Sequence, residues 1–184
     1  MVEKVKLNLG AGNDIKDGYI NHDIAEITGI DVIHDLNTTP WPWESEKFEK
    51  VIAIDVLEHL DNFFEVMEEL HRITKENGTI EIKVPYWNSS FCHMDPTHKQ
   101  LFHEMTFHFL DPDKDLCQSR NYYTNARFKI IKEEFVLMPF APYFRIPFLK
   151  PIKVKRKLSK RIVGFFGNLF SNIILDLEIE LQKV

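Results

Sequence analysis

The stretch Val5-Lys-Leu-Asn-Leu-Gly-Ala-Gly-Asn13 joins an alternating apolar segment directly to a turn that contains two glycines. Alternation of apolar and polar residues is typical of a β-strand, and the glycines indicate where that strand ends. Glycine lets the backbone approach a ligand closely, and free amides in such a turn can hold an anion. The stretch therefore predicts a first strand whose carboxyl end belongs to a ligand site.

Working outward from this turn, strand patterns alternate with helical ones. The expected strands are residues 5–9, 19–23, 31–35, 51–56, 79–85, 128–138 and 173–184. Apolar residues recur at helical spacing over 61–77, where Asp61 would cap the start and Gly78 would end the helix. A second helix is expected within 93–109, beginning near Pro96, and a third over 157–170. This order predicts a Rossmann-like α/β three-layer sandwich with a mostly parallel seven-stranded sheet and an antiparallel last strand.

Aspartates close the early strands of this sheet. Asp23 follows Gly10 by 13 residues, Asp35 ends the third strand, and Asp55 lies at the end of the fourth. Ligands of parallel α/β sheets bind at the carboxyl ends of the strands, where a carboxylate can accept both hydroxyls of a ribose. The ordered set of a glycine turn and three aspartates therefore indicates a nucleoside-containing ligand.

In this order the sequence resembles the class I methyltransferases that use S-adenosylmethionine (SAM), specifically the group with a compact type 11 methyltransferase domain. The resemblance covers roughly the first 87 residues. It rests on Leu7-Asn-Leu-Gly-Ala-Gly-Asn13, Ile20-Asn-His-Asp23, Asp35-Leu36, Val51-Ile-Ala-Ile-Asp-Val-Leu-Glu-His-Leu60 and Ile73-Thr-Lys-Glu-Asn-Gly-Thr-Ile-Glu-Ile82.

The resemblance implies SAM as the cofactor and assigns ten residues to it. They are Leu9, Gly10, Ala11, Gly12, Asn13, Asp23, Asp35, Leu36, Asp55 and Val56. The glycine turn would hold the methionine part, and Asp23 would bind the ribose. Asp35 and Leu36 would frame the adenine, while Asp55 and Val56 would border the sulfonium and the methionine amine.

One departure from the family concerns the first crossover. Only the six residues from Asn13 to Gly18 separate the glycine turn from the next strand, whereas a crossover with a full helix needs at least about 10–12. We therefore expect the first helix to be a single turn or absent, and the cofactor site to be more open than is usual.

Histidines and a carboxylate follow the fourth and fifth strands, whose ends are neighbours in a parallel sheet. His59, His93, Asp95 and His98 are the candidate catalytic residues. A histidine near its ordinary pKa can take a proton from an acceptor hydroxyl or nitrogen near neutral pH, and an adjacent aspartate can fix its tautomer.

The Asp55-Val-Leu-Glu58-His59 segment also resembles the Glu-x-x-Glu-His motif of metal-assisted methyltransferases, among them plant-type small-RNA 2′-O-methyltransferases and quinone O-methyltransferases. His93 or His98 would complete a divalent-metal site there. The sequence departs from the motif at Asp55, which is one methylene shorter than glutamate. Because Leu-Glu-His-Leu also occurs in methyltransferases without metal, the sequence leaves metal dependence open.

The remainder of the chain carries an uneven charge. The net charge is −5, yet no acidic residue occurs from Phe135 to Leu175. The cationic residues of that stretch are Arg145, Lys150, Lys153, Lys155, Arg156, Lys157, Lys160 and Arg161. Residues 141–172 are expected to be an insertion between the last two strands. Two interpretations stay open: a helical lid over the acceptor pocket, or an interfacial anchor that meets anionic lipid.

We therefore expect one domain over residues 1–184 that transfers a methyl group to an oxygen or nitrogen of a small-molecule or lipid-linked acceptor. The alternatives are a non-catalytic SAM-binding or interaction module and a metal-assisted O-methyltransferase acting on RNA or a phenol. Nucleic acid is disfavoured as a partner because no recognition pattern accompanies the basic residues. Two cysteines without a disulfide framework and no apolar stretch of ~18–20 residues favour a cytoplasmic protein, with peripheral membrane contact through 145–175 left open. The acceptor and the oligomeric state are not specified by the sequence.

Overall fold

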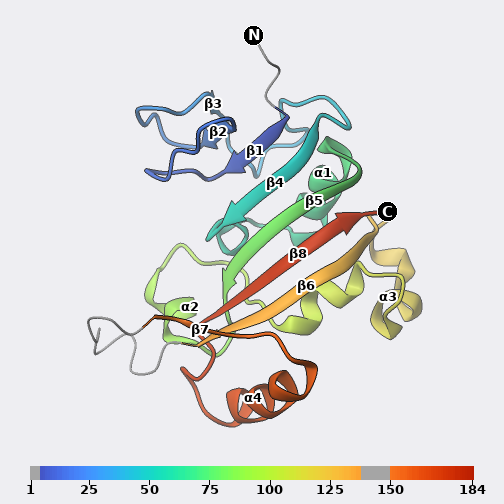
Figure 1. The fold of residues 1–184 in the computed structure, drawn as a ribbon. Helices are drawn as coiled ribbons and strands as arrows, with labels where there is room; N and C mark the ends of the chain where they lie inside the picture. Colours follow the sequence, from blue (N-terminus) through green and yellow to red (C-terminus); the bar gives the residue numbers. More distant parts are fainter. Residues whose placement is uncertain (1–4, 138–149) are drawn as a thin grey trace.

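An eight-stranded sheet in the order β3-β2-β1-β4-β5-β8-β6-β7 forms the centre of the fold (Figure 1). The computed structural model describes residues 5–137 and 150–184. The strands are β1 (Lys6–Leu9), β2 (Ile20–Asp23), β3 (Val32–Ile33), β4 (Phe48–Ile54), β5 (Thr74–Pro85), β6 (Phe128–Leu137), β7 (Ile152–Val154) and β8 (Asp176–Lys183). The helices are α1 (Phe63–Ile73), α2 (Ser90–Met94), α3 (Asp115–Ser119) and α4 (Lys157–Leu169), with short 3-10 turns η1 (Leu57–His59), η2 (Glu104–Phe109) and η3 (Asn121–Tyr123).

The strand directions confirm the Rossmann-like prediction. Strands β3, β2, β1, β4 and β5 are mutually parallel, and β8 pairs antiparallel with both β5 and β6. The sheet differs from the expected seven strands by the edge strand β7, which pairs antiparallel with β6. This strand lies inside the expected insertion 141–172, of which residues 141–149, including Arg145, fall outside the described residues.

Helix α1 is shorter than the helix expected over 61–77. Its N-cap is Asn62 rather than Asp61, because the Asn62 side chain accepts hydrogen bonds from two amides of the first turn. It ends at Ile73 because Thr74 already pairs with Phe48 of β4. The last residues of the expected helix therefore belong to strand β5. The expected helix start near Pro96 was also wrong, since α2 ends before this residue and η2 begins only at residue 104.

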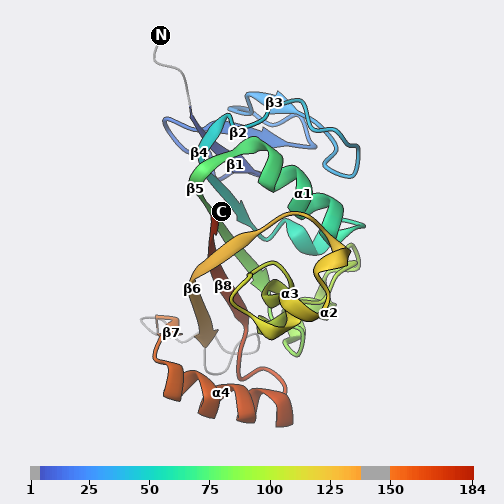
Figure 2. The same ribbon diagram turned by 90° about the vertical axis from the view of Figure 1, so that its right-hand side faces the viewer.

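Helices α1, α2 and α3 lie on one face of the sheet, as Figure 2 shows with the sheet seen edge-on, whereas α4 lies beneath the sheet at the bottom of that view. Along β8, Leu177, Ile179 and Leu181 are buried, while the alternate side chains, such as Glu178 and Glu180, are only half-buried on the opposite face. The described residues thus form two layers over most of the sheet rather than the expected three. The cause is the short connections, because only turns join β1 to β2 and β2 to β3. The expectation that the first crossover lacks a full helix is confirmed.

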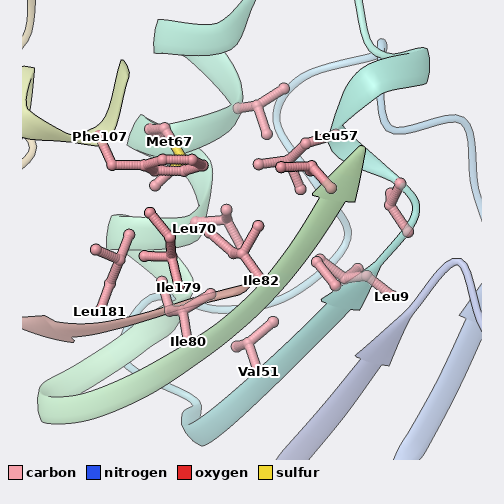
Figure 3. Close-up of a cluster of buried hydrophobic side chains, with 14 of the residues drawn as sticks. Leu9, Val51, Leu57, Met67, Leu70, Ile80, Ile82, Phe107, Ile179 and Leu181 are labelled. Atoms are coloured by element: carbon pink, nitrogen blue, oxygen red, sulfur yellow. The ribbon is translucent and has the colours of Figure 1, made fainter. Parts of the chain in front are cut away.

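The main core lies between α1 and the sheet (Figure 3). Met67 and Leu70 of α1 are fully buried, and they belong to one cluster with Ile80 and Ile82 of β5. Burying each of these side chains contributes about 1.5–3 kcal/mol of transfer free energy. This packing fixes the carboxyl ends of β4 and β5, where the polar residues gather.

Candidate functional site

A pocket of about 560 Å³, named here the glycine-turn pocket, lies at the carboxyl ends of β1, β2 and β4. Six of the ten residues that the resemblance assigns to the cofactor line it. They are Gly10, Asp23, Asp35, Leu36, Asp55 and Val56. The other four do not line it: Leu9 and Ala11 are buried, and Gly12 and Asn13 lie in the turn beside it.

Gly10 is required at the floor of this pocket for two reasons. Its φ is +56°, a conformation that glycine adopts readily, and a Cβ there would lie 2.5 Å from Cγ2 of Val56. The turn is then tied to the next strand, because the Gly12 amide donates a 2.8 Å hydrogen bond to Oδ2 of Asp23. Oδ1 of Asp23 accepts another from the amide of Ala25 at 2.9 Å. The Asp23 carboxylate is thereby held in a fixed orientation beside the pocket.

A second pocket of about 570 Å³, named here the histidine pocket, adjoins the first. Its lining includes Glu58, Asp95 and His98. Two residues, Asp55 and His59, line both pockets. A group bound in one pocket would therefore face a group bound in the other across this pair of side chains.

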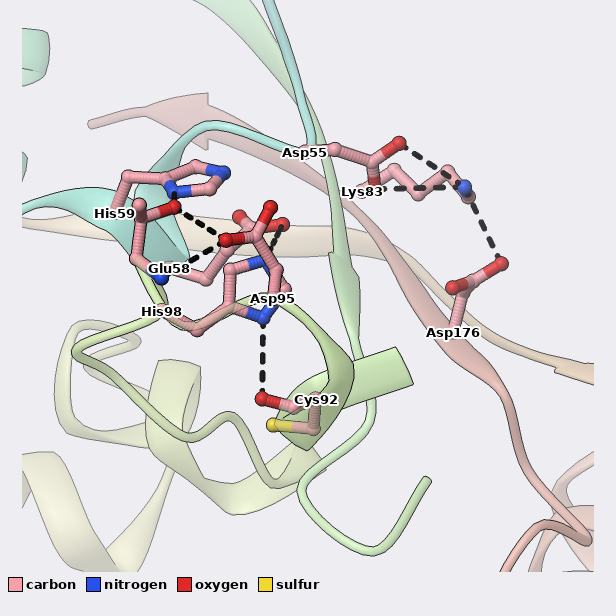
Figure 4. Close-up of polar contacts among 9 residues, drawn as sticks. Asp55, Glu58, His59, Lys83, Cys92, Asp95, His98 and Asp176 are labelled. Atoms are coloured by element: carbon pink, nitrogen blue, oxygen red, sulfur yellow. Dashed lines mark hydrogen bonds and ion pairs between the residues drawn. The ribbon is translucent and has the colours of Figure 1, made fainter. Parts of the chain in front are cut away.

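The His59 ring is oriented by a chain of two hydrogen bonds (Figure 4). The Thr97 hydroxyl lies 2.6 Å from Oδ1 of Asp95 and 2.9 Å from Nδ1 of His59. Hydrogen bonds from the Thr97 hydroxyl and amide lower the pKa of Asp95, so this carboxylate only accepts and takes the hydroxyl proton. The Thr97 oxygen must then accept from Nδ1 of neutral His59. This tautomer leaves Nε2 of His59 with a free lone pair.

Glu58 is the buried acid of the site. Its side chain is 1% exposed, and neither carboxylate oxygen has a hydrogen-bond partner among the described residues. Burial raises its pKa from 4.5 to about 7. Nε2 of His98 lies 4.0 Å from Oε1 of Glu58, and Nδ1 of His98 is 3.1 Å from the carbonyl oxygen of Cys92. A carbonyl only accepts, so neutral His98 also carries its proton on Nδ1 and turns a lone pair toward Glu58.

One ligand atom each from Glu58, His59 and His98 lies within 4.8 Å of the other two. Asp55, which the resemblance to the metal-assisted motif included, is not part of this group. Asp55 has a φ of +54°, and its carboxylate oxygens lie 3.4 Å from Nζ of Lys83, on the neighbouring strand β5. Figure 4 shows Asp55 and Lys83 on one side and the histidines on the other.

Lys83 joins two carboxylates at the edge of the histidine pocket, since its Nζ also lies 3.2 Å from Oδ2 of Asp176. Burial lowers the pKa of Lys83, but Asp176 and Asp55 outweigh burial and raise it above its ordinary value. Burial raises the pKa of Asp176. Lys83 is therefore a permanent cation that neutralises this part of the pocket.

Of the four candidate catalytic residues, the structure brings three together. His59, Asp95 and His98 converge, whereas His93 is exposed on α2 and lines neither pocket. Sequence reasoning missed Thr97 as the link between Asp95 and His59. The signal was present, because an aspartate two residues before a threonine often accepts its amide, as Asp95 does here at 2.8 Å.

Comparison with known proteins agrees with this architecture. Residues 32–82 match the sequence model of a family described as a methyltransferase domain. No protein of curated function matches the chain by sequence.

Solved structures share the fold over nearly the whole chain. A SAM-dependent methyltransferase from Archaeoglobus fulgidus superposes with a TM-score of 0.61 at 19% identity, over 97% of this chain and 85% of that one. A SAM-dependent methyltransferase from Thermotoga maritima gives a TM-score of 0.61 at 14% identity, over 100% of this chain and 84% of that one. The [4+2]-cyclase SpnF gives 0.55 at 11% identity, over 97% and 73%. The matched segment, 32–82, contains β3, β4, η1 and α1 and so includes one wall of both pockets. Residues 32–82 thus resemble a methyltransferase domain, and the whole chain shares its fold with solved SAM-dependent methyltransferases.

Proposed function

We propose that this chain transfers the methyl group of SAM to an oxygen or nitrogen of a small-molecule or lipid-linked acceptor. The observation that carries the proposal is the pair of adjoining pockets that share Asp55 and His59 as a common wall. A methyl donor in the glycine-turn pocket and an acceptor in the histidine pocket would meet at that wall. The arrangement supplies the proximity and orientation on which direct group transfer depends.

The residues of the glycine-turn pocket fit the parts of SAM. The fixed carboxylate of Asp23 is suited to accept the ribose hydroxyls, and Asp35 with Leu36 is suited to the adenine. Val56 packs against the bare backbone of Gly10, and both residues line the pocket where the methionine part of SAM would lie. The Gly12 amide is already used by Asp23, so this glycine supports the cofactor through the carboxylate rather than by direct contact.

The proposed base is His59. Bound SAM would supply a methyl carbon on a positively charged sulfur, and the acceptor atom would bond to that carbon as the carbon–sulfur bond breaks. Nε2 of His59 takes the proton that the acceptor loses, and the Thr97–Asp95 chain stabilises the resulting imidazolium. Lys83 holds Asp55 away from His59, so the aspartate does not compete for that proton.

Binding of the product S-adenosylhomocysteine (SAH), measured by calorimetry, tests the cofactor part. Loss of the charge-assisted hydrogen bonds from ribose should cost Asp23→Ala about 1.5–3 kcal/mol of binding free energy. The matched control is Asp17→Ala, an exposed aspartate in the connection between β1 and β2, which should bind as the wild type does. Absence of wild-type binding would refute the proposal. Binding without turnover on any acceptor would favour the non-catalytic module instead.

A second candidate is metal-assisted methyl transfer, which the orphaned carboxylate of Glu58 favours. A buried carboxylate without partners is costly, and a divalent cation held by Glu58, His59 and His98 would remove that cost. One carboxylate and two imidazoles suit several first-row metals, and the ion would orient an acceptor oxygen. In this variant of the proposal His59 is a ligand and not the base.

Calorimetric titration with Mn²⁺ or Zn²⁺ separates the two candidates. Metal binding that is lost in Glu58→Gln, together with activity abolished by a chelator and restored by the ion, would support the metal. Chelator-insensitive activity would leave His59 as the base.

The wider setting is also part of the proposal. We infer a single domain over residues 1–184, because one hydrophobic cluster includes side chains from β1 to β8. Both cysteines are buried and unpaired, which supports a cytoplasmic location. None of the helices in the described residues combines the length and the apolar character needed to cross a bilayer.

A further inference from the structure

Helix α4 presents its apolar side chains to solvent. The exposed side chains, with their exposed fractions, are Leu158 (71%), Ile162 (53%), Phe165 (62%), Phe166 (46%), Leu169 (60%) and, directly after the helix, Phe170 (58%). The five within the helix are spaced at i, i+4, i+7, i+8 and i+11 and so fall within about 100° of its circumference. We call these six residues the α4 apolar face.

The opposite side of α4 is the one that packs on the protein. Its buried residues are Gly164 and Gly167. A Cβ at Gly164 would lie 3.6 Å from the Phe135 ring of β6, and one at Gly167 only 2.7 Å from Ile174. The helix backbone therefore approaches Ile174 too closely at Gly167 for a Cβ to fit without a shift, whereas at Gly164 a Cβ would make an ordinary contact with Phe135. This packing points the apolar face outward, the reverse of what a lid over an acceptor pocket would need.

The outward orientation is fixed by polar contacts as well. Lys160 forms an ion pair with Glu133 of β6, on the inner side of the helix. The Asn88 side chain donates a 2.7 Å hydrogen bond to the carbonyl oxygen of Gly167. Because Asn88 follows β5 closely, α4 is attached to the same end of the sheet as the two pockets (Figure 1).

Cations flank the apolar face. Lys157 and Arg161 lie on one row of the helix with Phe165, each four residues apart, and Arg156 precedes them. All three cations are exposed and form no ion pair with another described residue. The sequence supplies no acidic residue from Phe135 to Leu175.

A pocket of about 630 Å³ beside the first turns of α4 extends this cationic zone. Six cationic side chains line it against two carboxylates, those of Glu104 and Glu133. The cations are Lys114, Lys132, Lys155, Lys157, Lys160 and Arg161. Lys132, Lys155 and Lys160 form ion pairs with glutamates, so the unbalanced charge comes from the other three. The charge of this zone is complementary to the phosphates of anionic lipid headgroups.

We propose that α4 attaches the protein to an anionic lipid surface. The α4 apolar face enters the boundary between headgroups and acyl chains, while Arg156, Lys157 and Arg161 meet lipid phosphates. Pairing of this face with that of a second copy is disfavoured, since the same cations would meet across a twofold axis. The attachment brings the histidine pocket to the membrane, because Pro151 and Leu175, on either side of α4 in the chain, line that pocket.

Sedimentation with vesicles tests the proposal on the full chain. The wild type should co-sediment with phosphatidylcholine vesicles that contain phosphatidylserine, and added salt should weaken the binding. Leu169→Glu replaces an exposed apolar side chain of this face with a charged one and should weaken binding more than tenfold. Arg161→Glu should weaken it at least about fivefold, the equivalent of ~1 kcal/mol per cation.

Matched controls carry the same substitutions elsewhere on the surface. Tyr122→Glu replaces a side chain that is 74% exposed on η3, and Lys129→Glu replaces an exposed lysine at the start of β6, far from α4. Both should bind vesicles as the wild type does. A Phe165→Trp variant should in addition show a blue-shifted fluorescence emission with anionic vesicles.

Absence of wild-type binding to anionic vesicles at low salt would overturn the proposal, as would equal, salt-insensitive binding to pure phosphatidylcholine. If Leu169→Glu instead converts a dimer to a monomer in size-exclusion chromatography, the apolar face is an interface between copies. The affinity for SAH is measured on every variant. Because α4 does not line the glycine-turn pocket, this affinity should stay unchanged, and failure of the anchor is distinguishable from failure of the methyltransferase proposal.

Discussion

Glu58 offers the sharpest test of the electrostatics of the site. Its pKa in the folded chain is about 7, above the ordinary value of 4.5 that applies when the chain unfolds. Between these two pH values the folded state holds a proton that the unfolded state has lost, so the free energy of unfolding falls as pH rises from 4.5 to 7. Below pH 4.5 the ionisation of Glu58 costs no stability, and above pH 7 the free energy of unfolding has fallen by the full amount.

The size of this effect follows from the separation of the two pKa values. A separation of about 2.5 pH units corresponds to about 3 kcal/mol, at roughly 1.4 kcal/mol per unit. Glu58→Gln removes the ionisation without changing the size of the side chain. The free energy of unfolding of the variant should therefore rise by about 3 kcal/mol relative to that of the wild type as pH increases from 4.5 to about 8. This change does not depend on how the stabilities of the two proteins differ at the lower pH.

Urea unfolding at a series of pH values, with a chelator present, measures this difference. Glu26→Gln, an exposed carboxylate, is the control and should follow the wild type within about 0.5 kcal/mol. A difference between Glu58→Gln and wild type that does not vary with pH would refute the reasoning. If the metal-assisted candidate holds, a divalent ion in place of the chelator should stabilise the wild type and leave the Gln variant unaffected.

Two further substitutions test the fold around the site. Gly10→Ala sets a Cβ 2.5 Å from Val56 in a backbone of φ +56°, so thermal unfolding should show a loss of about 1–3 kcal/mol and calorimetry a weaker affinity for SAH. An unchanged melting temperature would contradict the geometry of this turn. Met67→Ala empties a fully buried position between α1 and the sheet and should cost about 2–5 kcal/mol in urea unfolding, whereas the same change at exposed Met105 should cost less than about 0.5 kcal/mol.

The fold could be predicted from the sequence where the pattern is local. The alternating run before Gly10 and the apolar run after residue 50 identify buried parallel strands, and the short link from Asn13 to Gly18 excludes a full crossover helix. The extent of α1 could not be predicted in this way. Whether Thr74 continues the helix or begins β5 depends on its pairing with Phe48, which no local pattern records.

The site shows the same division. The position of Asp23 at a strand end is a consequence of chain order, and the structure places it beside the glycine turn. The direction of the Asp55 side chain does not follow from chain order. It depends on a left-handed backbone at Asp55 and on the register that sets Ile54 opposite Lys83. For this reason Asp55 does not belong to the group of Glu58, His59 and His98, and of the two histidines considered to complete a metal site, His98 is the one in that group.

Helix α4 could be predicted as an amphipathic helix but not in its orientation. The apolar spacing is the same whether the apolar side faces the protein or the solvent. The orientation is set by the side with Gly164 and Gly167, which packs on Phe135 and Ile174 and leaves no room for a Cβ at Gly167. The extra edge strand β7 was not expected, because three residues give too short a pattern to recognise.

A crystal structure of the complex with SAH would show directly whether the two pockets hold the donor and the acceptor. We predict that the adenosine lies in the glycine-turn pocket, with the ribose hydroxyls on Asp23 and the sulfur facing the wall that Asp55 and His59 share with the histidine pocket. A complex in which SAH lies elsewhere, or in which its sulfur faces away from His59, would contradict methyl transfer between these two pockets.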